Sequence, residues 1–152
     1  MKVYRISKCQ YVDDLSGKGA ANYSGRWHSK GTYILYTASS PSLALLESVV
    51  HISKIVVADY CMICLEVPED KIQEIKVTDL PDNWNVNPSP DILKFYGDAF
   101  IRESKFFALK LASAIMPEEN NLLLNPNHPD FKKVKVEYKR NIPIDERLVK
   151  NK

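Results

Sequence analysis

The sequence predicts an α+β fold, formed by one compact domain over residues 1–152 with mixed β-sheets and a few helices. Two observations support this prediction. Segments typical of strands outnumber the helical segments, and the two kinds do not alternate regularly as they do in βαβ units. In addition, Pro117 and the segment NPNHP (125–129) indicate turns within a domain rather than a linker between two domains. A chain of 152 residues is long enough to bury a core without disulfides or metals.

The elements follow from local patterns in the order of the chain. Apolar or alternating runs predict strands at 2–6, 32–38, 55–67, 74–78, 106–113, 121–125 and 133–141, and helical patterns cover 41–53 and 91–104. The first helix has clear start signals, because Ser40 is a good N-cap and Pro41 occupies the first helical position, where its missing N–H costs nothing.

Two further segments have a characteristic composition. The stretch from Tyr11 to Lys30 is rich in Gly, Ser, Asn and Asp, which predicts a long surface loop, and such loops are often functional. In the last strand, Lys133, Lys135, Glu137 and Lys139 alternate with apolar residues. This alternation predicts a strand with one solvated face rather than a phosphate-binding patch.

Charge and hydropathy exclude several classes of protein. The net charge of only +2 gives no basic face of the kind that nucleic-acid binding requires. No apolar run approaches the roughly 18 residues that a membrane helix needs. The opening MKVYRIS lacks the apolar core of a signal peptide, so we expect a cytoplasmic location and no membrane partner.

The cysteines and histidines do not predict a metal site. Cys61 and Cys64 lie three apart in a predicted strand and face opposite sides, so we interpret them as buried structural thiols rather than as metal ligands. An odd number of cysteines, with Cys9 as the third, does not make a disulfide framework. The histidines lack the H-x-x-x-H and H-E-x-x-H spacings. There is also no Walker A loop and no G-x-G-x-x-G, so we expect no metal or bound cofactor.

Glu47 is the first candidate functional residue. In helix 41–53 it lies on an apolar stripe with Leu43, Leu46 and Val50, where a carboxylate must be paired, hydrogen-bonded or protonated. Arg26, in a glycine-flanked loop, is a candidate partner. The spacing alone leaves two interpretations open: a structural Glu–Arg pair that holds the loop to the helix, or an active site.

Three other residues are candidates for ligand binding. Arg5 on the first strand offers a second guanidinium for a phosphate or carboxylate, or is simply a surface residue. Tyr36 at the end of its strand packs in the core or stacks on a flat ring. Ser113 bonds a substrate hydroxyl or caps a turn, and without a G-x-S-x-G motif a Ser-His-Asp nucleophile has little support.

These residues occur in motifs that resemble one known family. The segments YRI (4–6), GRWHSKG (25–31), LYTASSPSLALLE (35–47) and LASAIMPEENNLLLNPNHPDF (111–131) resemble the RES domain family, named for its Arg, Glu and Ser. The resemblance covers nearly the whole chain in order and spacing. It departs at His28, where the family commonly has Asn, and at Ala112-Ser113-Ala114, where it commonly has Pro-Ser-Ala.

The resemblance implies a fold and an activity. It implies an ADP-ribosyltransferase-like fold and a bacterial type II toxin that consumes NAD⁺ as a substrate by cleaving the nicotinamide–ribose bond, with water or inorganic phosphate as the acceptor. Matched by position, Arg26, Tyr36 and Glu47 correspond to catalytic residues, and Arg5 and Ser113 join them in binding NAD⁺. In this scheme the two arginines bind the diphosphate and the tyrosine stacks on nicotinamide. The glutamate carboxylate stabilises the oxocarbenium ion that forms on the ribose.

The resemblance also implies a partner, an Xre-type antitoxin that masks the active site. Two alternatives to NAD⁺ degradation remain at this point. The same pocket would serve an ADP-ribosyltransferase that modifies a protein, and a non-catalytic binding module would bind NAD⁺ without turnover. An RNA-cleaving toxin is disfavoured by the low net charge and the lack of a His acid–base pair.

Overall fold

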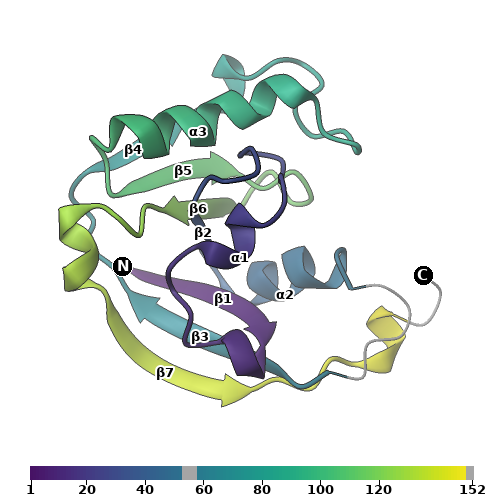
Figure 1. The fold of residues 1–152 in the computed structure, drawn as a ribbon. Coiled ribbons are helices and arrows are strands. Elements are labelled where there is room, and N and C mark those ends of the chain that lie inside the picture. Colours follow the sequence, from purple (N-terminus) through teal and green to yellow (C-terminus); the bar gives the residue numbers. More distant parts are fainter. Residues whose placement is uncertain (53–57, 150–152) are drawn as a thin grey trace.

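The computed structural model describes residues 1–52 and 58–149, and in this part of the chain all strands belong to one sheet of seven (Figure 1). Their order is β4-β5-β6-β2-β1-β3-β7, and only the β4–β5 pair is parallel. The strands are β1 (Lys2–Lys8), β2 (Leu35–Ala38), β3 (Tyr60–Glu66), β4 (Ile72–Ile75), β5 (Ala108–Ala112), β6 (Asn120–Leu124) and β7 (Lys135–Asn141). The mixed sheet confirms the predicted α+β class.

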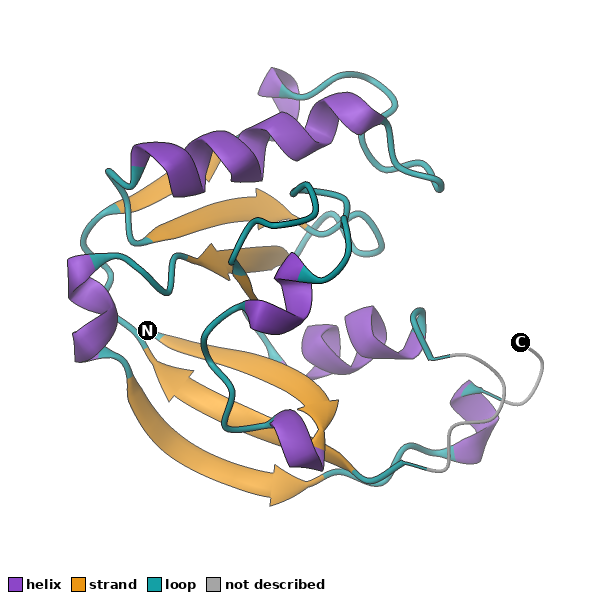
Figure 2. Cartoon of the chain, in the orientation of Figure 1, coloured by secondary structure: helices purple, strands orange, loops and turns teal. Residues whose placement is uncertain are grey.

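The helices are few and short (Figure 2). They are α1 (Lys18–Ala21), α2 (Pro41–Val49) and α3 (Lys94–Glu103), with 3-10 helices at Cys9–Tyr11, Val77–Asp79, Asp91–Leu93, Pro129–Lys133 and Glu146–Leu148. The predicted start of α2 is confirmed, because the Leu43 backbone N–H donates to Ser40 Oγ at 3.1 Å. The helix ends at Val49, earlier than predicted, and residues 53–57 of the predicted helix and following strand lie outside the described residues.

The sheet is divided by a weak joint at its centre. Strands β1 and β2 pair only through Tyr4 and Ala38, whereas β1 pairs with β3 along its whole length from Lys2 to Lys8. The sheet therefore consists of two half-sheets, β4-β5-β6-β2 and β1-β3-β7, which lie one above the other in Figure 1. One core lies between them, formed by the buried side chains Val3, Leu35, Ile63, Leu65, Phe107, Leu122 and Leu124.

The two longer helices cover the outer side of the first half-sheet and the joint. Helix α3 and the 3-10 helix before it pack on the first half-sheet through Phe100 and Leu93, which meet the apolar side chains of β5 and β6. Helix α2 packs beside the joint, where Leu43 and Ala44 contact Ala38. The joint is thus bridged mainly by a helix rather than by a hydrogen-bond ladder.

The segment from Tyr11 to Lys30 differs from the predicted surface loop. It contains α1, and it buries Val12, Ala21 and Trp27 against the two half-sheets. Its backbone is also tied internally, because the Gly31 N–H donates to the Ala21 carbonyl at 2.8 Å. Composition indicated the lack of long elements but could not reveal these tertiary contacts.

Two predictions about the second half-sheet are wrong. Every residue of β7 is exposed, so the alternation did not mark a buried face: β7 is an edge strand, and Val136 and Tyr138 remain in solvent. Cys61 is not a free thiol, because it forms a disulfide with Cys9, whereas Cys64 is free and buried. The prediction that Cys61 and Cys64 diverge is confirmed.

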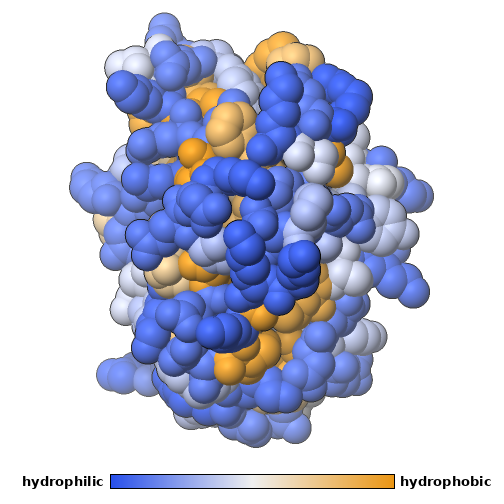
Figure 3. Space-filling model, turned by 90° about the vertical axis from the view of Figure 1, so that its left-hand side faces the viewer, coloured by the Kyte–Doolittle hydropathy of each residue, from blue (hydrophilic) through white to orange (hydrophobic). Residues whose placement is uncertain are grey.

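No helix in the described residues is long and apolar enough to cross a membrane. The face seen in Figure 3 is mostly hydrophilic, with apolar side chains gathered in separate patches.

Candidate active site

Glu47 is held by two hydrogen bonds to one oxygen of its carboxylate. Ser113 Oγ donates to Glu47 Oε1 at 2.8 Å, and Asn121 Nδ2 donates to the same oxygen at 2.6 Å. Two donors on one oxygen suit an ionised carboxylate, which only accepts hydrogen bonds. The predicted apolar stripe is wrong at Val50, which is 47% exposed, so Glu47 is only half-buried. The carboxylate is therefore fixed in position and still accessible.

Ser113 caps a turn, which is one of the two roles that the sequence left open, and it also donates to Glu47. Its hydroxyl oxygen accepts the backbone N–H groups of Ile115 and Met116, both at 3.1 Å, and so caps the turn after β5. Its only proton is thereby directed to Glu47. Ser113 is 0% exposed, so its hydroxyl is enclosed by these three partners.

Asn121 is a site residue that the sequence analysis missed. It is 8% exposed and interrupts the apolar strand β6, where a buried amide needs a partner. That polar residue in an apolar run was the available signal. The identity of its partner, Glu47, depends on the packing of α2 against the sheet and was not available from spacing.

Arg26 does not form the predicted ion pair with Glu47. Among the described residues no salt bridge joins them, and Arg26 Nη1 instead donates to the carbonyls of Trp84 at 2.7 Å and Val86 at 3.0 Å. Burial lowers the pKa of Arg26, and the nearby charge of Glu47 partly offsets this effect. Arg26 and Glu47 thus interact electrostatically, but each forms its hydrogen bonds with other groups. The purely structural Glu–Arg pair is therefore excluded.

Tyr36 and His28 form a second fixed pair. His28 Nε2 faces the carbonyl oxygens of Ala20 at 2.8 Å and Tyr23 at 2.9 Å, so this nitrogen carries the proton. His28 Nδ1 then accepts from the Tyr36 hydroxyl at 2.7 Å. Burial raises the pKa of Tyr36 well above its usual value, and it remains a neutral phenol. His28, 3% exposed, thus shapes the loop and orients Tyr36.

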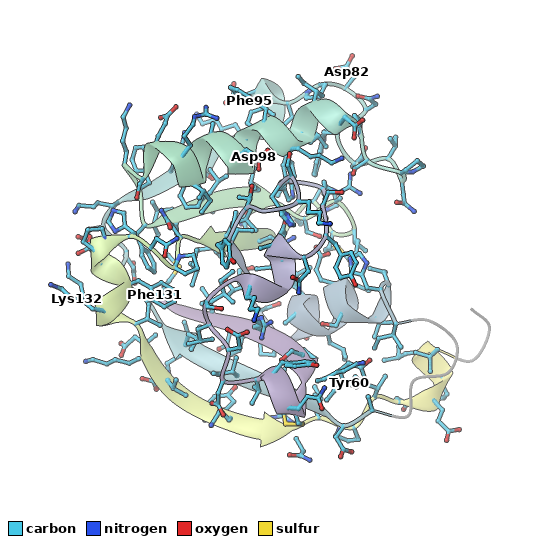
Figure 4. The ribbon with its side chains drawn as sticks, in the orientation of Figure 1. Tyr60, Asp82, Phe95, Asp98, Phe131 and Lys132 are labelled. Carbon is cyan, nitrogen blue, oxygen red and sulfur yellow. A yellow bond between two sulfur atoms is a disulfide. The ribbon has the colours of Figure 1, made fainter. Side chains whose placement is uncertain are left out.

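The loop that carries Arg26 is fastened to α3. Asp98 accepts hydrogen bonds from Ser29 N at 2.9 Å, Ser29 Oγ at 2.5 Å and Thr32 Oγ1 at 2.8 Å, and Figure 4 shows its side chain on the side of α3 that faces this loop. Gly97 allows the close approach, because a Cβ at this position would lie 2.0 Å from the Trp27 carbonyl oxygen. The positions of Arg26 and Trp27 are therefore determined by the surface of α3.

Arg5, the remaining candidate, lies on β1 in the other half-sheet. Its Nη1 atom is buried without a hydrogen-bond partner. Burial lowers the pKa of Arg5, and Asp14 counteracts this effect from the neighbouring segment. A buried donor without a partner costs free energy, about 1–3 kcal/mol for typical groups, unless a ligand or solvent satisfies it.

The described residues contain no group of three or more His, Cys, Asp and Glu that could hold a metal ion. A surface hollow of about 530 Å³ is lined by residues of the 13–16 segment, by Tyr33 and by residues of 126–131, and none of Arg26, Tyr36 or Glu47 lines it. Asp14 in this hollow already accepts from Ser16 N and Oγ. The candidate residues around Glu47 therefore lie outside this hollow.

The architecture belongs to a known class. One chain of the Mycobacterium tuberculosis MbcT–MbcA toxin–antitoxin complex superposes with a TM-score of 0.78 at 15% identity, covering 93% of this chain and 83% of that chain. That chain, MbcT, has an ADP-ribosyltransferase-like fold. The split sheet with a carboxylate beside its joint is therefore an ADP-ribosyltransferase-like fold.

Sequence comparison gives the particular family. The model of the RES domain matches residues 2–148, and the chain belongs to the RES domain family. A protein named Toxin Res from Photorhabdus laumondii subsp. laumondii is 37% identical over 155 residues, which cover 100% of this chain and 99% of that protein. The Prs ADP-ribosylating toxin of Sphingobium sp. (strain YBL2) is 37% identical over 143 residues, 91% of this chain and 89% of its own length. This chain is a toxin of the RES family.

Proposed function

We propose that this toxin degrades NAD⁺ by cleaving the N-glycosidic bond between nicotinamide and ribose. The observation that carries the proposal is the Glu47 carboxylate, which is held on one oxygen by Ser113 and Asn121 and remains partly exposed. Such a group suits the stabilisation of a positive charge that develops beside it, because its position is fixed before the reaction.

The chemistry needs little beyond this carboxylate. When the bond between the ribose carbon and the nicotinamide nitrogen breaks, its electron pair leaves with nicotinamide, which departs neutral. The ribose then becomes an oxocarbenium ion, which Glu47 stabilises electrostatically. Attack by water gives ADP-ribose and releases a proton, whereas attack by inorganic phosphate gives a phosphorylated ADP-ribose.

The other site residues suit the rest of NAD⁺. Arg5 presents a buried Nη1 atom without a partner, which an oxygen of the diphosphate would satisfy. Arg26 uses only Nη1 for the carbonyls of Trp84 and Val86, so its other nitrogens remain for a phosphate. Tyr36 has its hydroxyl bonded to His28, so it offers its ring as a surface for the flat nicotinamide.

The decisive experiment is a measurement of free NAD⁺ in cells induced to express the wild-type chain or Glu47→Gln. A glutamine keeps an acceptor oxygen for Ser113 and Asn121, so the fold is preserved while the negative charge is lost. We expect rapid NAD⁺ loss and growth arrest with the wild type, and at least about 100-fold slower loss with the variant. A folded wild type that leaves NAD⁺ intact refutes the proposal.

The acceptor is tested with the purified protein. ADP-ribose as product identifies water, and a phosphorylated ADP-ribose that forms only when phosphate is supplied identifies phosphate. One relative bears the name Prs ADP-ribosylating toxin, which favours protein modification as the second candidate function. Transfer of label from adenine-labelled NAD⁺ to a protein, with little free ADP-ribose, would establish that alternative. Growth arrest that survives Glu47→Gln would indicate a non-catalytic binding module.

We further propose that an Xre-type antitoxin covers this site. Support comes from the fold match, since the matched structure is a toxin–antitoxin complex. An enzyme that consumes NAD⁺ would harm its own cell, so it needs tight inhibition. Co-expression of the cognate antitoxin should restore NAD⁺ levels and growth. A complex that forms without loss of NAD⁺ consumption would show that the antitoxin binds elsewhere.

A further inference from the structure

We propose that Asn121 is a positioning residue, which holds one oxygen of Glu47 so that the other oxygen faces the reacting ribose. This inference rests on the proposed function for its chemistry, but the contact itself does not depend on it. Asn121 touches no reacting atom in this scheme and acts only through Glu47.

The strand pairing places Asn121 within the site. On β6 it is paired with Ala38 of β2 on one side and with Leu111 of β5 on the other, so its backbone is held in the middle of the half-sheet. Tyr36 is paired with Leu123, two residues further along β6. Side chains two apart on a strand, and those of directly paired residues, share one face of a sheet. Asn121 and Tyr36 therefore project from the same face.

The two carboxylate oxygens of Glu47 differ in their hydrogen bonds. An ionised carboxylate accepts only, so the Asn121 amide must turn its nitrogen toward it, as the 2.6 Å contact with Oε1 shows. Ser113 donates to the same oxygen. Within residues 1–52 and 58–149, no donor bonds to Oε2, which leaves it for a ligand.

Neither donor alone fixes the orientation of the carboxylate. With Ser113 as the only tether, the carboxylate can rotate about one hydrogen bond and exchange its two oxygens. A second donor, Asn121 on β6, removes this freedom. Because a misplacement of about 1 Å can cost roughly 100-fold in rate, orientation of this group matters for turnover.

The contact is tested first without any assay of activity. In ¹⁵N NMR spectra, the side-chain amide of Asn121 should shift downfield through its bond to a carboxylate and should move when Glu47→Gln is introduced. Asn120 provides the matched control, since it is the preceding residue and its side chain makes no hydrogen bond within the described chain. An Asn121 amide that is unaffected by Glu47→Gln overturns the inference, whatever the reaction proves to be.

Kinetics then tests the consequence. For Asn121→Ala we expect kcat for NAD⁺ consumption to fall by roughly 10- to 100-fold while KM changes little, because orientation and not binding is lost. Asn120→Ala should behave as the wild type. If Asn121→Ala lowers only the Tm, or raises KM at unchanged kcat, the positioning role is refuted while the proposed function stands.

An isosteric variant gives a pH signature that a structural role would not produce. Asn121→Asp places a second carboxylate against Glu47 at neutral pH, and two adjacent carboxylates resist joint ionisation. At lower pH the introduced group binds a proton and can donate again to Oε1, so activity relative to wild type should rise. The groups that interact with Glu47 electrostatically from the neighbouring elements are Arg26 and Tyr36, and both keep their charge state over this range. Asn120→Asp should show no such rise. If the relative activity of Asn121→Asp also fails to rise at lower pH, the inference is contradicted.

Failure of the proposed function is distinguishable from failure of this inference. If the wild type arrests growth without consuming NAD⁺, the proposed function is refuted. The NMR contact and the growth arrest by Asn121→Ala, compared with Asn120→Ala, then still decide whether Asn121 positions Glu47. An unchanged arrest with Asn121→Ala would refute positioning on this second measure.

Discussion

Replacement of Gly97 by alanine should damage the site from a distance. Gly97 lies in α3, and an added Cβ would stand 2.0 Å from the Trp27 carbonyl oxygen, so that backbone must retreat by about 1 Å to reach a tolerated contact. Overpacking of this kind costs about 1–3 kcal/mol, and the better helix propensity of alanine returns about 1 kcal/mol. The clash is with backbone on a loop fastened to the same helix, so the cost lies at the upper end of this range, about 3 kcal/mol, and we expect a net loss of about 2 kcal/mol.

The displaced backbone also carries the neighbouring Arg26, so activity should fall together with stability. Thermal unfolding should show a Tm lower by roughly 4–8 °C, and NAD⁺ consumption measured well below the Tm should fall by about tenfold or more. Gly19→Ala is the matched control, since an added Cβ in α1 meets no atom within 4 Å. If Gly97→Ala equals Gly19→Ala in both Tm and activity, the close approach of α3 to the loop does not determine the site.

Two further predictions concern stability. Hydrogen bonds from Lys133 and then Lys71 lower the pKa of the Asp130 carboxyl to about 2. Because this folded pKa lies below the unfolded value of about 3.9, the stabilisation is present above about pH 4 and is lost as pH falls toward 2. In urea unfolding between pH 5 and 2, the free energy of unfolding should fall with pH in the wild type and fall less in Asp130→Asn. An equal fall in both proteins would refute the prediction. The Cys9–Cys61 disulfide joins residues 52 apart in the sequence. Cys9→Ser should therefore lower the free energy of unfolding by about 2–4 kcal/mol under oxidising conditions and leave it unchanged under full reduction. A difference between the two proteins that persists in reductant would contradict this explanation.

Local sequence signals predicted the elements better than their contacts. The N-cap of α2 at Ser40 was predictable because it depends on residues next to one another in the chain. The exposure of Val136 on β7 was not, since alternation is the same whether a strand has a covering layer or lies uncovered at an edge. The disulfide between Cys9 and Cys61 required the pairing of β1 with β3 to be known.

The same limit applies to the site. Residue types and motif order singled out Arg26, Tyr36 and Glu47 as candidates, and in the structure both Arg26 and Tyr36 interact electrostatically with Glu47. The hydrogen-bond partners of Glu47 could not be predicted, because Ser113 and Asn121 reach it only through the packing of α2 on the first half-sheet. Arg26 was an attractive partner by charge, yet backbone carbonyls hold it instead.

The short connection between β5 and β6 has a consequence for how this protein tolerates change. Ser113 begins it, and Asn121 is the second residue of the strand after it. Between them Glu119 accepts a hydrogen bond at 2.7 Å from Ser40, the N-cap of α2. The Ser113 N–H donates to the Glu119 carbonyl at 2.9 Å and closes the connection on itself. Surface loops usually accept insertions and deletions, but this one acts as a spacer of fixed length. One added residue would shift Glu119 away from Ser40 or move Ser113 and Asn121 relative to Glu47. Natural variation in length should therefore concentrate in other loops.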